Sequence, residues 1–177
     1  MNATENSMDS PRRGLLIEML AAGCAIVFIL ILGISAYWDP TIRVLHVFEA
    51  LPYAAAAVLV LRRNKLGYTL GVAGGAFWLW TAGLLTTFIR NGFERAMMLL
   101  RTGHVDRLDI LIAAPAACGT AGLVLFSIWG YLRARNKSWR DFGLFAATLG
   151  AVAAYFVAIF AVFAPRYLDQ FRHIFGK

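Results

Sequence analysis

The stretch from residue 15 to residue 37 reads LLIEMLAAGCAIVFILILGISAY and contains one charged residue, Glu18. An α-helix needs about 20 predominantly apolar residues to cross the roughly 30 Å hydrocarbon core of a bilayer. The stretch meets this length and therefore predicts a membrane-spanning helix. A signal peptide is the alternative, because Arg12 and Arg13 precede the apolar run. A signal core is usually only about 7 to 15 residues long, so we expect this span to be retained.

Four further apolar runs follow along the chain. The predicted spans cover residues 15–37, 40–61, 66–89, 109–132 and 141–164. The second reaches spanning length because Asp39-Pro40 has the pattern of a helix cap followed by proline in the first turn. Composition agrees, since 60% of the 177 residues are hydrophobic and only 15% are charged, against roughly 25% charged in soluble domains. The expected fold class is an all-α integral membrane protein, a bundle of five transmembrane helices.

The longest connection, residues 90–109, has an amphipathic pattern of its own. Asn91 and Glu94 have capping-box spacing, and apolar residues recur after them with helical periodicity. This predicts a short interfacial helix over about 92–102, between the third and fourth spans. We expect it to connect the two spans, and a lid or docking surface is the alternative. The expected organisation is a polar tail over 1–10, one transmembrane domain over 11–165 and a short tail over 166–177.

Positive charge gathers in two short connections, 62–65 and 133–140. Short basic loops stay on the cytoplasmic side of a membrane, which predicts an N-terminus in the cytoplasm and a C-terminus outside a cell (inner) membrane. These loops account for much of the net charge of +7 and would attract anionic lipid headgroups. No loop is long enough for a basic nucleic-acid-binding domain. The expected partner is the lipid bilayer, and we expect no nucleic acid.

Small residues recur at intervals of four in two of the predicted spans. They are Gly67, Gly71 and Gly75 in the third span, and Ala146, Gly150 and Ala154 in the fifth. Small residues at this spacing let helix backbones approach closely inside a membrane. Packing within one chain is the more economical interpretation. Self-association, or packing against other membrane subunits, is the alternative.

Glu49 is an acidic residue well inside an apolar run, and such residues are functional candidates because burying a charge in a membrane is costly. His46, Glu49 and Tyr53 lie at helical spacing and form one polar stripe. Pro52 cannot donate a hydrogen bond to the carbonyl of Phe48, which becomes available as an acceptor.

The polar stripe has two interpretations. In the functional one, it is a protonatable or cation-binding site that opens to the outer face. In the structural one, Glu49 is satisfied inside the bundle by Tyr53, Arg43, Arg90 or Thr86, since polar groups often hold membrane helices together. The structural interpretation is favoured because we find no second acidic residue at the same depth.

No sequence motif assigns a reaction, so we expect no catalytic residues and no cofactor. The three histidines lack the spacing of metal ligands, so we predict no metal site. We favour a non-enzymatic subunit or assembly component of a membrane complex. A small proton- or cation-coupled carrier or channel built on the polar stripe is the second hypothesis. An intramembrane enzyme acting on lipid or quinone, with Glu49 and His46 as acid and base, is the third.

Overall fold

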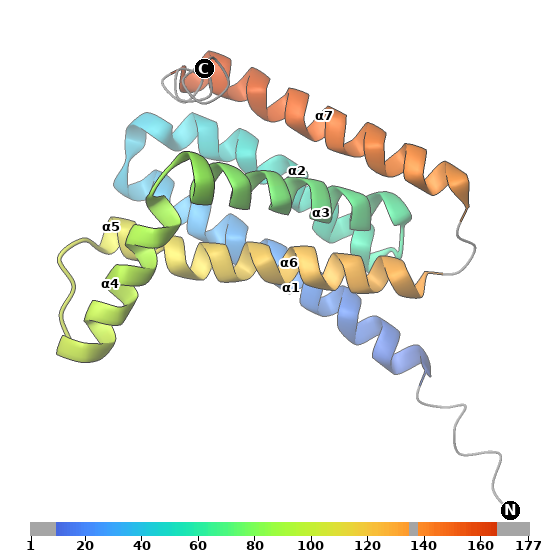
Figure 1. Ribbon diagram of the computed structural model, residues 1–177, viewed down its shortest axis with the longest axis horizontal. Helices are drawn as coiled ribbons and strands as arrows, with labels where there is room; N and C mark the ends of the chain where they lie inside the picture. Colours follow the sequence, from blue (N-terminus) through green and yellow to red (C-terminus); the bar gives the residue numbers. More distant parts are fainter. Residues whose placement is uncertain (1–9, 135–137, 166–177) are drawn as a thin grey trace, which may run out of the picture.

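The computed structural model describes residues 10–134 and 138–165, and the regular elements in these two ranges are all helices (Figure 1). In chain order they are α1 (Ser10–Trp38), the short 3-10 helix η2 (Pro40–Ile42), α2 (Arg43–Leu61), α3 (Lys65–Trp80), the π-helix η3 (Thr81–Leu85), α4 (Phe88–Thr102), α5 (Leu108–Leu111), α6 (Ala113–Arg133) and α7 (Trp139–Phe163). The tails expected at 1–10 and 166–177 lie outside the described residues, except for Ser10, which begins α1.

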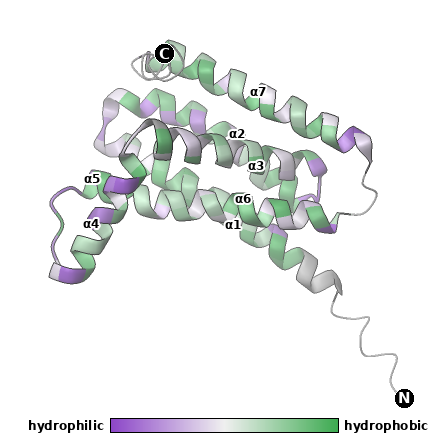
Figure 2. Ribbon diagram, in the orientation of Figure 1, coloured by the Kyte–Doolittle hydropathy of each residue, from purple (hydrophilic) through white to green (hydrophobic). Residues whose placement is uncertain are grey.

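Four helical segments of the described chain are long and apolar enough to cross a membrane. They are Leu15–Trp38, Pro40–Leu61, Leu108–Arg133 and Trp139–Phe163. A fifth span results if Lys65–Leu84 and Phe88–Thr102, which meet at a bend of 76°, count as one. Hydrophobic residues cover the long helices, and hydrophilic ones gather at their ends and in α4 (Figure 2). The expected all-helical fold is confirmed for the described residues, and its long apolar helices are compatible with a membrane-embedded protein.

The chain runs back and forth along one axis, so its connections gather at two ends of the bundle (Figure 1). We call the end with the 62–65 turn and the α6–α7 connection the basic end. The opposite end, where α4 turns away from the bundle, is the α4 end. α1 packs against α2 and α6, whereas α3 lies centrally and packs against α2, α6 and α7.

The three predicted small positions of α3 are all buried. A Cβ at Gly67 would lie 2.5 Å from the backbone nitrogen of Val60, and one at Gly75 would lie 2.6 Å from Cγ2 of Val124. These separations are shorter than van der Waals contact. Glycine at these positions therefore allows α3 to approach α2 and α6 closely.

The small residues of α7, by contrast, face outward. Ala146, Gly150 and Ala154 are exposed, and a Cβ at Gly150 would meet nothing within 4 Å. The buried side of α7 consists of larger residues: Thr148, Val152, Phe156 and Ile159. Two residues along a helix correspond to about 200° of rotation, so the small and large series lie on nearly opposite faces. Packing of this small face within the chain, which the sequence favoured, does not occur in the described residues.

The third span is broken, where the sequence predicted a continuous helix over 66–89. α3 ends at Trp80, η3 continues to Leu85, and α4 begins at Phe88 in a new direction. The hydroxyls of Thr81 and Thr86 donate to the carbonyls of Phe77 and Ala82, at 2.8 Å each, beside the break. Because of the break, the helix expected over 92–102 is part of α4 and begins earlier, at Phe88.

Candidate functional site

The N-terminal half of α2 carries the polar stripe, and its direction is set at the preceding connection. Asp39 caps the turn by accepting a hydrogen bond from the backbone N–H of Thr41 at 2.9 Å, and Pro40 follows at the first helical position. From this start, α2 brings His46, Glu49 and Tyr53 towards the interior of the bundle. Glu49 and Tyr53 are buried, and His46 is partly exposed.

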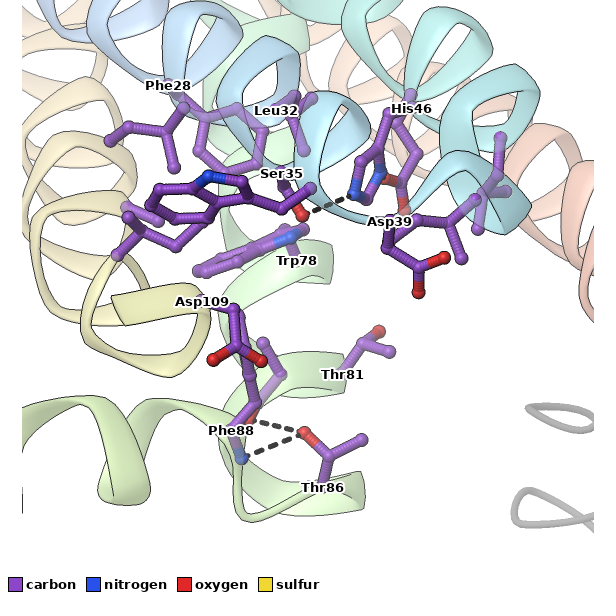
Figure 3. Close-up of a pocket in the computed structure, with 18 of the residues that line it drawn as sticks. Phe28, Leu32, Ser35, Asp39, His46, Trp78, Thr81, Thr86, Phe88 and Asp109 are labelled. Atoms are coloured by element: carbon purple, nitrogen blue, oxygen red, sulfur yellow. Dashed lines mark hydrogen bonds and ion pairs between the residues drawn. The ribbon is translucent and has the colours of Figure 1, made fainter. Parts of the chain in front are cut away.

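His46 and Glu49 form a close pair. Nδ1 of His46 lies 2.6 Å from Oε2 of Glu49, and the two side chains are only 14% and 7% exposed. Nε2 of His46 lies 3.1 Å from the Ser35 hydroxyl of α1 (Figure 3). A hydroxyl can donate or accept, so Ser35 can serve both the neutral and the protonated ring. The arrangement can therefore bind or release a proton without losing its hydrogen bonds.

Tyr53 is on the same side of α2 but does not join this pair. Its hydroxyl donates to the carbonyl of Gly74 on α3 at 2.9 Å, and its ring packs against Phe28 at a centroid distance of 4.4 Å. Phe28 also packs edge-on against Trp78 at 4.9 Å. The aromatic cluster of Phe28, Tyr53 and Trp78 thus packs in the bundle interior next to the His46–Glu49 pair.

The carbonyl that Pro52 leaves free has a partner from another helix. The hydroxyl of Tyr155 on α7 donates to the Phe48 carbonyl at 2.8 Å. This hydrogen bond ties α7 to α2 beside the polar stripe. The availability of the Phe48 carbonyl follows from the sequence, but its donor lies 107 residues away and has no sequence signal.

The other partners considered for Glu49 are engaged elsewhere. Arg43 donates to the Ala36 carbonyl at 3.3 Å, Arg90 donates to Glu94 at 3.0 Å, and Thr86 donates to the Ala82 carbonyl of η3. Glu49 is instead paired with His46, its neighbour on the same stripe.

A cavity of about 540 Å³ lies beside the His46–Glu49 pair at the α4 end (Figure 3). Aromatic side chains from several helices line it: Phe28, Trp38, Trp78, Phe88 and Phe160. Asp39, Glu49 and Asp109 also line it, and among the described residues no lysine or arginine does. The cavity therefore combines aromatic faces with carboxylates, which is the chemistry that binds organic cations.

The break in the third span forms one wall of this cavity. Four residues around the break line the cavity: Thr81 of η3, Thr86 and Thr87 of the connection, and Phe88 at the start of α4. π-helical turns occur frequently at functional sites because they reposition side chains within a helix. A continuous helix over 66–89 would not present these residues in the same way.

Asp109 stands at the rim of the cavity and is paired with Arg107, whose Nη2 lies 2.6 Å from a carboxylate oxygen. The hydrogen bonds to Asp109 raise the pKa of the Arg107 guanidinium. Arg107 offsets the charge of Asp109, whose side chain is 45% exposed. Glu49 is the acidic residue of the cavity lining that is buried.

The described residues contain no group of three or more His, Cys, Asp or Glu side chains placed to hold a metal ion. His104 is exposed in the connection after α4. His173 lies outside the described residues.

Sequence reasoning missed a second buried carboxylate, at the basic end. Glu18 on α1 is 6% exposed, and its Oε1 accepts a hydrogen bond from the Tyr68 hydroxyl on α3 at 3.0 Å. Its other oxygen lies 3.5 Å from Nε of Arg63 and has no hydrogen-bond partner within the described chain. Glu18 lies near the start of its apolar run, so hydropathy alone does not place it inside the bundle.

The chain was compared with known proteins. No family model matches it, and no curated protein or solved structure matches it either.

Proposed function

We propose that the protein is a five-span integral membrane protein that binds a small organic cation in the cavity at the α4 end, as a proton-coupled carrier. The observation that carries this proposal is the placement of the His46–Glu49 pair beside a cavity with aromatic and acidic lining. Cations bind favourably over aromatic rings, and the interaction strengthens when the site is desolvated.

Proton coupling follows from the charge states of the pair. With Glu49 ionised and His46 neutral, the pair carries a negative charge that attracts a cation. A first proton makes the pair neutral overall, and a second gives it a net positive charge. A positive charge beside the cavity opposes cation binding. Cation and proton would therefore compete for the same site, as exchange between them requires.

We expect cation binding to be measurable with tetrapropylammonium, whose charge does not change with pH. In isothermal titration of the detergent-purified protein, binding should weaken as the pH is lowered, because a proton on the His46–Glu49 pair opposes the cation. Glu49→Gln should weaken binding by about tenfold or more, equivalent to ~1.4 kcal/mol.

The matched control for this experiment is Glu94→Gln. Glu94 is a half-exposed carboxylate on α4 that pairs with Arg90 and does not line the cavity. Glu94→Gln should leave the affinity unchanged. Equal affinity in wild type and in a normally folded Glu49→Gln variant would contradict the proposal.

The proposed orientation places the basic end in the cytoplasm and the cavity on the outer side, in a cell (inner) membrane. A reporter that works only in the cytoplasm should be active when fused after Lys65 or Lys137 and inactive when fused after Gly103. The physical reason is that basic loops are retained on the cytoplasmic side during insertion. The opposite pattern would show that the proposed orientation is inverted. Equal activity after Gly103 and after Lys137 would show that the fourth predicted span does not cross the membrane.

A non-enzymatic subunit or assembly component of a membrane complex is the second candidate function. The exposed small face of α7, formed by Ala146, Gly150 and Ala154, favours it because such faces pack against other membrane helices. A stoichiometric membrane partner that co-purifies in mild detergent would support this candidate. A monodisperse homo-oligomer without a partner would count against it.

A further inference from the structure

The cavity at the α4 end also indicates which kind of organic cation it accommodates. Its volume of about 540 Å³ is typical of a site for a small molecule. Trp38, Phe88 and Phe160 supply aromatic walls, and Glu49 supplies a carboxylate that is only 5% exposed. A cation in the cavity therefore meets apolar rings and one buried acidic group.

Three oxygen atoms of the lining residues keep free acceptor capacity. One oxygen of Glu49 belongs to the pair with His46, whereas Oε1 accepts no hydrogen bond from the described residues. The hydroxyl of Thr81 donates to the carbonyl four residues earlier at 2.8 Å and accepts none from the described chain. The side-chain nitrogen of Asn91 donates to Thr87 at 3.0 Å, and its oxygen likewise has no donor there. Each of these oxygens can accept a hydrogen bond from a ligand.

A hydrogen bond between α2 and α3 sets the levels of these groups along the bundle. Tyr53 of α2 donates to the Gly74 carbonyl of α3, and the two helices run in opposite directions (Figure 1). Glu49 precedes Tyr53 by four residues. Trp78 follows Gly74 by four, also towards the α4 end, so Trp78 and Glu49 are at the same level. Thr81 is three residues further, about 4.5 Å along the axis, which one small cation can span.

We infer that the cavity takes a primary ammonium ion that carries an aromatic or other apolar group, an inference that rests on the proposed function. The N–H groups of this ion donate to Oε1 of Glu49 and to the Thr81 hydroxyl, and its apolar group packs against the aromatic walls. A quaternary ammonium ion has the same charge but no N–H group, so it leaves these oxygens without a donor. Hydrogen bonds from a charged donor are stronger than neutral ones, and the site therefore distinguishes the two kinds of cation.

Isothermal titration with two probes of equal charge tests the inference. The probes are phenylethylammonium and its N,N,N-trimethyl derivative, with the full chain in detergent at neutral pH, where an alkylamine with a pKa of about 10 keeps its proton. We expect the primary ammonium ion to bind about tenfold more tightly, because only this ion can form the hydrogen bonds. Equal or tighter binding of the trimethyl derivative would overturn the inference and leave the proposed function standing. Binding of neither probe would overturn both.

Thr81→Val tests the hydroxyl contact directly. Valine has nearly the shape of threonine but cannot accept a hydrogen bond. We expect the affinity for phenylethylammonium to fall about tenfold, and the affinity for the trimethyl derivative to stay as in the wild type. The larger size of the trimethyl derivative cannot produce this pattern, because each probe is compared with itself. Equal losses for the two probes would indicate a distorted cavity and would contradict the role of Thr81.

The matched control is Thr102→Val. Thr102 is an exposed residue of α4 whose hydroxyl also donates to the carbonyl four residues earlier, at 2.9 Å, and it does not line the cavity. Its replacement should leave both affinities unchanged. If Thr81→Val does not fold, the comparison of the two probes on the wild type still decides between a primary and a quaternary ammonium ion.

Discussion

Replacing Gly71 with leucine is expected to prevent formation of a stable bundle. A Cβ at Gly71 would collide with the Ser127 hydroxyl and would lie 3.2 Å from Cδ1 of Leu123 on α6. Overpacking of a tight core typically costs about 1–3 kcal/mol, and an isobutyl group is a large addition at a position without any side chain. We expect little folded protein from membranes, and a melting temperature in detergent far below that of the wild type.

The matched control is Gly150→Leu. Gly150 lies in the middle of α7, where an added Cβ meets nothing within 4 Å. The same change there should leave the melting temperature close to that of the wild type. Gly92, although it belongs to a connection in the sequence, is not a suitable control because its Cβ would lie 2.6 Å from Cβ of Ala113. Equal tolerance of leucine at Gly71 and Gly150 would contradict the close α3–α6 contact.

Hydropathy and capping patterns predicted much of the fold because they are local. A long apolar run requires a helix in a membrane, where backbone groups have no water to bind. Helix starts were also predictable where a side chain caps its own backbone. At α7, Ser138 and Asp141 form the reciprocal capping box that their spacing indicates.

Features that depend on contacts between distant helices could not be predicted in this way. The break after Trp80 falls inside an apolar run, where hydropathy alone does not distinguish a continuous helix from a bent one. Periodicity identified small residues on one side of α7 but not which side faces the bundle. The larger side, with Val152 and Phe156, packs inward because it contributes more apolar contact.

In the candidate site, too, only the features that depend on local spacing could be predicted from the sequence. The spacing of His46 and Glu49 predicted that they share a face, and one turn of helix brings them into contact. The sequence does not indicate the cavity beside them, because its walls come from several helices. The burial of Glu18 could not be predicted either, because Tyr68, which donates a hydrogen bond to it, is 50 residues away in the sequence.

Breaking the Glu18–Tyr68 hydrogen bond is expected to destabilise the protein strongly. Glu18→Leu leaves the Tyr68 hydroxyl buried without an acceptor, and Tyr68→Phe leaves the carboxylate without its donor. An unsatisfied buried polar group costs about 1–3 kcal/mol, and more when it is charged. Thermal or denaturant unfolding in detergent should show a clear loss for each single variant. Arg63 adds little to this loss because its side chain is 55% exposed and can turn to water.

The double variant distinguishes a specific pair from two independent packing defects. With Glu18→Leu and Tyr68→Phe together, neither side chain retains an unsatisfied polar group, so the loss should be smaller than the sum of the single losses. The Tyr68 ring itself stays packed against Gly130, which limits the damage from removing the hydroxyl. Directly contacting residues typically show coupling energies of about 0.5–3 kcal/mol. Strictly additive losses would mean that the hydrogen bond contributes nothing to folding, and that Glu18 stays solvated at the basic end.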